Sequence, residues 1–118
     1  MPIEELITLI KTHKNDIEFD AVINAIEEQY LYTPSRFTNG GNGHILINEA
    51  GTNEGSCKIF SFAMLNGLNK EETLACFGKY YRDDVLQNPQ NEDHQNIRNF
   101  MISGWDGINF DNQALERK

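Results

Sequence analysis

Two polar segments carry the residues with the clearest chemical potential. The first, NEAGTNEGSCK, covers residues 48–58, and the second, DHQNIRN, covers residues 93–99. Cys57 and His94 supply the thiol and the imidazole that a cysteine nucleophile and its base require. The positive end of a helix favours a thiolate in its first turn, and Lys58 adds a neighbouring cation. This pair therefore suggests an acyl-transfer or hydrolytic site.

A purely structural role for Cys57 is the simpler interpretation. Free cysteine is among the most buried residue types, and it packs as a small apolar side chain. A lone cysteine and a lone histidine in different segments are weak evidence for catalysis. Packing under a helix start therefore stays open beside the nucleophile hypothesis.

The same two segments and the region around residue 81 contain polar groups suited to ligand binding. The candidate ligand-binding residues are Asn48, Glu49, Asn53, Glu54, Lys58, Tyr81, Arg82, Asn96, Arg98 and Asn99. Arginine anchors carboxylates and phosphates, although arginine beside an acid more often forms a structural ion pair. Tyr81 follows another tyrosine, so on a helix the two rings point about 100° apart and only one reaches the core.

Four side chains are of types that bind divalent ions, namely Glu49, Glu54, Asp93 and His94. Their spacing supports no metal site, because the two segments lie about forty residues apart and the sequence contains neither CxxC nor HExxH. Helix capping explains most of them better, with Asn53 and Asp93 as N-caps. We therefore predict neither a metal nor another cofactor.

Hydrophobic periodicity indicates the elements that position these segments. Helices are expected over residues 3–13, 19–30, 56–65, 69–86 and 93–103. The helix over 56–65 is apolar on most sides and should be the most buried one. Residues 30–38 and 44–48 flank a glycine-rich turn and predict a β-hairpin, and the tail supplies a third short strand. The predicted fold class is α+β, a mostly helical single domain with about five helices and a small antiparallel β element.

Local signals mark several helix ends. Asn69 and Glu72 form an Asn-led capping box at the start of the fourth helix. Gly67 and Gly104 are expected to end the third and fifth helices. Because the two polar segments open the third and fifth helices, we expect them to lie close together in the folded chain.

The charge balance narrows the classes of partner. The chain has 118 residues with 10 Lys and Arg against 18 Asp and Glu, which gives a net charge of −8. Such acidity argues against nucleic acid and against an anionic membrane surface as partners. With no secretory signal at the start and no apolar run of membrane-spanning length, we expect a cytoplasmic protein with reduced thiols.

Four runs of the sequence resemble the HopJ type III effector family. They are YTPSRFTNG, NEAGTNEGSCKIFSFAMLNGL, LACFGKYYRDDVL and DHQNIRNFMISGW, within a resemblance that extends from about residue 3 to 115. The resemblance implies a small bacterial protein whose one domain covers residues 1–118, with no established biochemical activity. It also implies secretion by a type III system as an alternative to the cytoplasm, although the N-terminus predicts an amphipathic helix rather than a pliable signal.

Three functional hypotheses follow. The leading one is a binding protein with a polar pocket formed by the two segments, in which Glu54 and Arg98 are essential. Its partner is an unidentified protein or small molecule, and a host protein if the chain is secreted. The second is a cysteine-dependent hydrolase or acyltransferase using Cys57 and His94. In the third, the two segments are only a structural capping network, with their polar groups satisfied internally and no pocket left.

Overall fold

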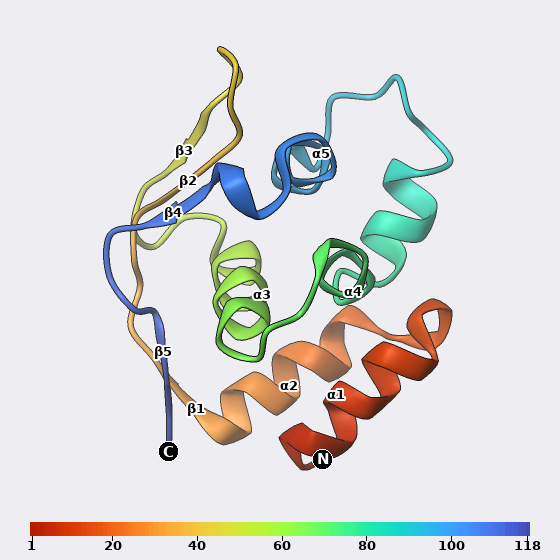
Figure 1. The fold of residues 1–118 in the computed structure, drawn as a ribbon, viewed down its shortest axis with the longest axis vertical. Coiled ribbons are helices and arrows are strands. Elements are labelled where there is room, and N and C mark those ends of the chain that lie inside the picture. Colours follow the sequence, from red (N-terminus) through yellow and green to blue (C-terminus); the bar gives the residue numbers. More distant parts are fainter.

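A computed structural model describes all 118 residues, and it places five α-helices beside two small antiparallel sheets (Figure 1). The helices are α1 (Ile3–Thr12), α2 (Phe19–Gln29), α3 (Glu54–Leu65), α4 (Lys70–Ala75) and α5 (Gln95–Ser103). The strands are β1 (Tyr30–Tyr32), β2 (Phe37–Asn39), β3 (Leu46–Asn48), β4 (Ile108–Phe110) and β5 (Leu115–Arg117). Three shorter helical segments are η1 (Lys14–Asp16), the π-helix η2 (Tyr80–Val85) and η3 (Gly104–Gly107). The predicted α+β, mostly helical fold is confirmed.

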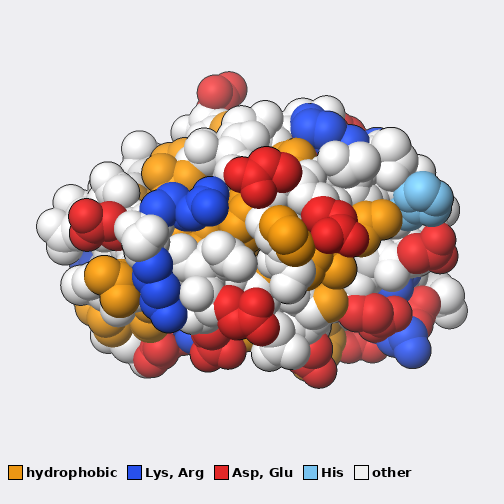
Figure 2. Space-filling model, turned by 90° about the horizontal axis from the view of Figure 1, so that it is seen from below, with side chains coloured by type: hydrophobic (Ala, Val, Ile, Leu, Met, Phe, Trp, Pro, Cys, Tyr) orange, Lys and Arg blue, Asp and Glu red, His pale blue; other side chains and the backbone are white.

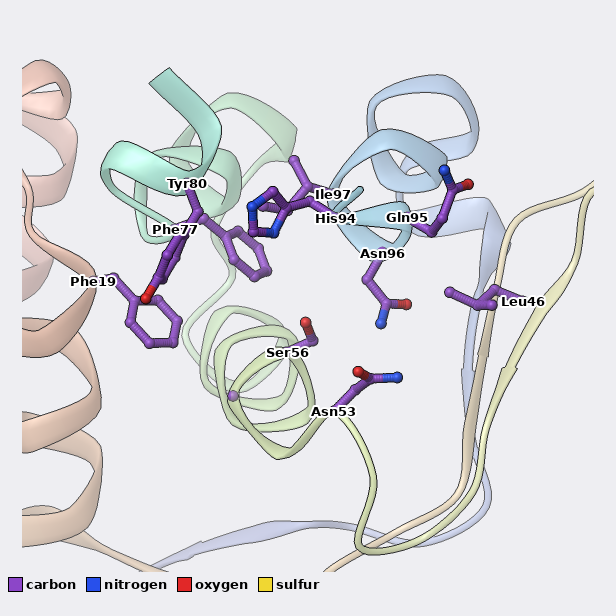
Figure 3. A pocket seen from close by; sticks show the side chains of 11 residues that line it. Phe19, Leu46, Asn53, Ser56, Phe77, Tyr80, His94, Gln95, Asn96 and Ile97 are labelled. Carbon is purple, nitrogen blue, oxygen red and sulfur yellow. The ribbon is translucent and has the colours of Figure 1, made fainter. Parts of the chain in front are cut away.

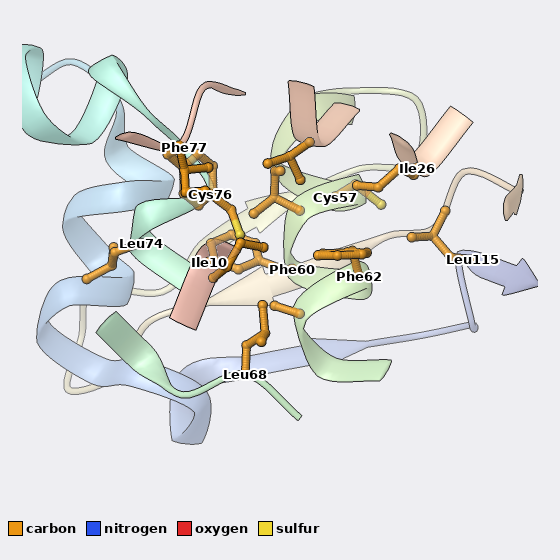
Figure 4. Close-up of a cluster of buried hydrophobic side chains, with 14 of the residues drawn as sticks. Ile10, Ile26, Cys57, Phe60, Phe62, Leu68, Leu74, Cys76, Phe77 and Leu115 are labelled. Carbon is orange, nitrogen blue, oxygen red and sulfur yellow. The ribbon is translucent and has the colours of Figure 1, made fainter. Parts of the chain in front are cut away.

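Helix α3 forms the centre of the molecule, with α2, α4, α5 and the sheets around it (Figure 1). Its residues from Ile59 to Ala63 are all buried, including the rings of Phe60 and Phe62. Figure 4 shows these rings among apolar side chains from α1, α2 and β5. Burying one phenylalanine stabilises a fold by roughly 1.5–3 kcal/mol, so α3 anchors the core. The prediction of a central helix is confirmed.

The β structure differs from the single hairpin and tail strand that the sequence predicts. Strands β2 and β3 form the expected hairpin, and β4 pairs with β2 on its other side, which gives the order β3-β2-β4. Strand β1 instead pairs with β5 in a separate sheet, where Tyr30 faces Arg117. The predicted strand over residues 30–38 is therefore divided in two. Pro34 lies in the break, and its missing N–H excludes it from a continuous ladder.

The predicted helix over residues 69–86 is also divided. Helix α4 ends at Ala75, and Gly78 then adopts a left-handed φ of +58°. A Cβ on Gly78 would stand 2.7 Å from the backbone nitrogen of Phe19, so this turn packs directly on the chain before α2. The π-helix η2 continues from Tyr80 in a new direction. Helical periodicity alone does not reveal such a close backbone approach.

Acidic side chains are scattered over the end of the molecule that carries α1 and α2 (Figure 2). Figure 2 shows them spread over this face between apolar and basic groups, without one dominant patch. This agrees with the sequence, in which residues 1–30 hold 7 acids and 2 bases. No helix of the fold has the length and apolar character needed to cross a bilayer.

Candidate functional site

The two polar segments meet through a network of buried asparagines. Asn48 at the end of β3 and Asn96 in α5 form a reciprocal amide pair, with N···O distances of 3.1 and 2.9 Å. Asn53 donates to Asn48 Oδ1 at 2.7 Å and so links the start of α3 to the pair. The predicted proximity of the two segments is confirmed.

Two further asparagines complete this network. Asn39 in β2 is fully buried, and its Nδ2 donates to the backbone oxygen of Asn96 at 2.8 Å and to its Oδ1 at 3.0 Å. Asn99 donates to the backbone oxygens of Asn39 and His44, each at 3.0 Å, and thereby ties α5 to the β2–β3 hairpin. No motif in the sequence marked Asn39 as part of this network. Its available signal was the excess of 14 asparagines in 118 residues.

A cleft of about 440 Å³ lies beside the network, between the starts of α3 and α5 (Figure 3). It is lined by side chains and backbone from α2, β3, α3, η2, α5 and the turn after α4: Phe19, Leu46, Asn53, Gly55, Ser56, Phe77, Tyr80, His94, Gln95, Asn96 and Ile97. One wall is aromatic and the opposite wall carries amide and hydroxyl groups. The cleft combines apolar contact area with directional hydrogen-bonding groups.

Both helix starts at the cleft lack side-chain caps. Asn53 and His94 occupy the N-cap positions of α3 and α5 with left-handed φ values of 49° and 52°. Neither side chain accepts a hydrogen bond from its own helix. The predicted N-cap for α5, Asp93, is wrong by one residue, and Asn53 is an N-cap by position only. The first N–H groups of each helix therefore lack intrahelical partners at the cleft.

His94 is the one histidine that lines the cleft. Its Nε2 lies 3.0 Å from Asp84 Oδ2, and its ring lies against Tyr80 with 5.3 Å between centroids. Arg98 donates to Asp93 Oδ1 at 2.7 Å, which holds the pKa of that exposed carboxyl below its usual value. The carboxylate of Asp93 therefore closes the loop before α5 by pairing with Arg98.

Cys57 and His94 do not share the cleft. Cys57 is 1% exposed, lies outside the cleft lining, and directs its Sγ to the backbone oxygen of Ser35 at 3.8 Å. Figure 4 places it among core side chains beside Ile26. Burial raises the pKa of the Cys57 thiol, which disfavours the thiolate that a nucleophile needs. The packing interpretation of Cys57 is the one that the structure supports.

Most of the predicted charged site residues lie outside the cleft. Lys58 pairs with Glu27 at 3.6 Å and sits over the Tyr32 ring, and Glu49 pairs with Arg36 at 3.5 Å. The others outside the cleft lining are Asn48, Glu54, Tyr81, Arg82, Arg98 and Asn99.

Arg82 and Arg98 form structural contacts. Arg82 donates to the backbone oxygen of Ile17 at 2.8 Å, and Arg98 donates to the backbone oxygen of Asp93 at 2.6 Å. Glu54 is exposed, so neither Glu54 nor Arg98 can serve as the test residue of a binding pocket. Among the twelve predicted site residues, Asn53, His94 and Asn96 line the cleft.

The aromatic wall and the small residues at the α3 start were not among the predicted site residues. Phe19 and Phe77 follow helical periodicity, so their apolar character indicated core rather than cleft. Gly55 and Ser56 lay within the first polar segment but attracted no assignment. Tyr80 carried a usable signal, because one of two adjacent tyrosines had to point away from the core.

The HopJ type III effector protein family has a model that matches residues 3–115. The chain belongs to the HopJ family. A crystal structure of a protein of unknown function, VPA0580, is similar to this chain, with 49% identity and a TM-score of 0.94. The match covers 100% of this chain and 95% of that chain. No protein with a curated description matches the chain.

The network and the cleft coexist in this HopJ chain. The capping-network hypothesis correctly expects polar side chains of both segments to bond one another, as Asn48, Asn53 and Asn96 do. It is wrong in expecting no pocket. No group of three or more His, Cys, Asp and Glu side chains is arranged to hold a metal ion.

Proposed function

We propose that this HopJ protein binds a small organic molecule in the cleft between the starts of α3 and α5. The ligand combines a flat apolar part with a hydrogen-bonding group such as an amide or a carboxylic acid derivative. The supporting observation is the lining of the cleft. An aromatic wall faces a polar wall, and the cleft has a volume of about 440 Å³. This volume and mixture are typical of small-molecule sites.

The aromatic wall suits the flat part of such a ligand. The Phe19 ring lies 5.1 Å from Tyr80 in an edge-to-face arrangement and 6.4 Å from Phe77 in a stacked one. Tyr80 is 44% exposed, so its ring keeps a free surface. An aromatic pair contributes about 0.5–1.5 kcal/mol beyond the area that it buries. A ligand ring packed on this wall would therefore gain affinity and be held in a preferred orientation.

The polar wall suits the hydrogen-bonding group. Asn53, Ser56 and Gln95 line it, and Asn96 is held there by the asparagine network. No lysine or arginine lines the cleft. Hydrogen bonds rather than ion pairs therefore orient the ligand, and the buried Asn96 amide is already fixed by its network before binding.

Ligand-observed and protein-observed NMR with a library of ring-bearing amides, esters and carboxylic acids tests this proposal. We expect shifts confined to the residues of the cleft. In Gly55→Ala, the new Cβ would lie 3.0 Å from Phe19 Cζ, so the ring must move and we expect about tenfold weaker binding.

Glu54→Gln is the matched control, because Glu54 is the preceding residue of α3, exposed and outside the cleft lining. Its affinity for the same fragments should equal that of the unchanged protein. Equal weakening in both variants, or shifts elsewhere in the molecule, would contradict the proposal.

A protein as the partner, a host protein in particular, and the cytoplasmic location stay predictions. The cysteine-dependent reaction receives no support from the geometry of Cys57.

A further inference from the structure

We propose that the cleft hydrolyses small carboxylic esters, with Ser56 as nucleophile, His94 as base and Asp84 as the residue that orients His94. The inference rests on the proposed function, because the ester must first occupy the cleft. Ser56 immediately precedes Cys57, the nucleophile that the sequence predicts. The Ser56 hydroxyl lies at the surface of the cleft, whereas the Cys57 thiol is buried.

Helix geometry explains why neighbouring residues differ so strongly. Successive side chains on an α-helix point about 100° apart. Cys57 faces the core and the backbone of Ser35, so Ser56 faces away from that side and lines the cleft. The Ser56 side chain is half-buried and directed into the cleft (Figure 3). Its hydroxyl is free to meet a bound molecule.

His94 has the orientation that a general base requires. The 3.0 Å contact with Asp84 Oδ2 places a proton on Nε2 and leaves the Nδ1 lone pair free to accept one. Figure 3 shows the imidazole and the Ser56 hydroxyl directed into the same space. No direct hydrogen bond joins them, and the proposed transfer of the Ser56 proton to Nδ1 therefore uses a bridging water that enters with the ester.

The start of α3 supplies groups that can stabilise the developing negative charge. The N–H groups of Gly55 and Ser56 belong to its first turn, before the first bond of the helix from Cys57 N to Asn53 O. Backbone N–H groups at a helix start favour an oxyanion. An ester whose carbonyl carbon meets Ser56 Oγ therefore has donors near its carbonyl oxygen.

The reaction balances with water as the only co-reactant. Ser56 Oγ bonds to the carbonyl carbon while its proton moves to His94. The bond from that carbon to the alcohol oxygen breaks, and the imidazolium returns the proton to the leaving alcohol. Water then attacks the acyl group on Ser56 with His94 again as base, which releases the carboxylic acid and restores the hydroxyl. The aromatic wall seats an apolar or aromatic substituent of the ester.

Labelling with an alkyl fluorophosphonate tests the inference on the unchanged protein. We expect one adduct, located on Ser56 by peptide mass spectrometry, together with hydrolysis of p-nitrophenyl butyrate above the solution rate. Ser56→Ala should abolish both signals. Ser61→Ala is the matched control on the same helix, because Ser61 lines a different cavity, and it should leave both unchanged.

His94→Asn tests the base while retaining a residue that tolerates the left-handed backbone at this position. We expect about a 100-fold slower reaction of Ser56, in line with the loss of a general base. Asp84→Asn should slow it at least about tenfold by favouring the other tautomer. Both effects should appear as pH-dependent rates, which a merely structural role would not produce.

Binding and chemistry fail in distinguishable ways. Fragments that bind the cleft by NMR without any fluorophosphonate adduct on Ser56 would overturn the esterase and leave the binding proposal intact. An adduct on another serine would do the same. Absence of both binding and labelling would overturn the two together.

Discussion

The first N–H groups of α4 are capped by a side chain, whereas those of α3 and α5 are not. At α4, Asn69 Oδ1 accepts from Glu72 N at 2.8 Å, and Glu72 Oε1 accepts from Asn69 N at 3.0 Å. Lys11 adds a 3.2 Å ion pair to Glu72. At α3 and α5, the N-cap residues Asn53 and His94 are left-handed and provide no side-chain cap.

This contrast separates groups that stabilise the fold from groups available to a ligand. A side-chain cap contributes typically about 1 kcal/mol, and α4, whose start lines no part of the cleft, has one. The uncapped starts of α3 and α5 face the same cleft. Their side chains serve other contacts, Asn53 with Asn48 and His94 with Asp84.

Helices α1 and α2 also begin without a side-chain cap, but their N-cap residues, Pro2 and Glu18, are extended. The starts of α3 and α5 differ because their N-cap residues, Asn53 and His94, are left-handed and both line the cleft.

The largest expected effect on stability comes from removing the Asn96 side chain beside the uncapped starts of α3 and α5. Asn96→Ala removes the buried side-chain amide that accepts from Asn39 and Asn48 and donates to Asn48, and we expect a loss of about 3 kcal/mol in the free energy of unfolding. Urea denaturation measures it. The exposed Asn109→Ala is the control and should change stability by less than about 0.5 kcal/mol. Similar values for both would show that the network contributes little.

A cysteine substitution at Ser56 tests whether Ser56 faces the cleft while Cys57 faces the core. Ser56→Cys places a thiol at the cleft, whereas the native Cys57 is buried with a raised pKa. We expect the new thiol to react with iodoacetamide at least about tenfold faster than Cys57 at neutral pH. Peptide mapping distinguishes them. Cys76, whose pKa burial raises to about 12, should react only after unfolding. Rapid labelling of Cys57 in the folded protein would contradict the conclusion that Cys57 faces the core.

The smallest expected effect on stability concerns the capping box at the start of α4. The backbone N–H of Asn69 and the Lys11 ammonium hold the pKa of Glu72 below its usual value. A lowered folded-state pKa contributes stability above the unfolded-state pKa, and this contribution is lost as pH falls through the folded value. Glu72→Gln should therefore be less stable than the unchanged protein at pH 7 by about 0.5 kcal/mol, with the gap closing as the pH falls through the lowered pKa of Glu72. A gap that widens toward acid would contradict this sign.

The sequence predicted the parts of the fold that depend on local patterns. Helical periodicity located α1, α2 and the central α3, and the capping box at Asn69 and Glu72 formed as expected. The glycine-rich turn predicted the hairpin of β2 and β3. The proximity of the two polar segments followed because each opens a helix that packs in the core.

The remaining features depend on contacts between distant residues. Gly78 breaks the fourth helix because it packs on the backbone before α2, which no local pattern encodes. The cleft draws Phe19 and Tyr80 from elements about sixty residues apart. Polar density in the sequence also misplaced the charged residues, since Lys58 and Arg98 pair with acids instead of lining the cleft. Which polar groups remain free is decided by the folded structure.

The asparagine network has a consequence for the order of folding. Its bonds join Asn48 to Asn96 and Asn39 to Asn96, across separations of 48 and 57 residues. Long loops must close before such bonds form, whereas the helices contain mainly local contacts. The asparagine network beside the cleft is therefore expected to form after the local contacts of the helices. Ligand competence should appear with the final cooperative step of folding, after most helical structure has formed.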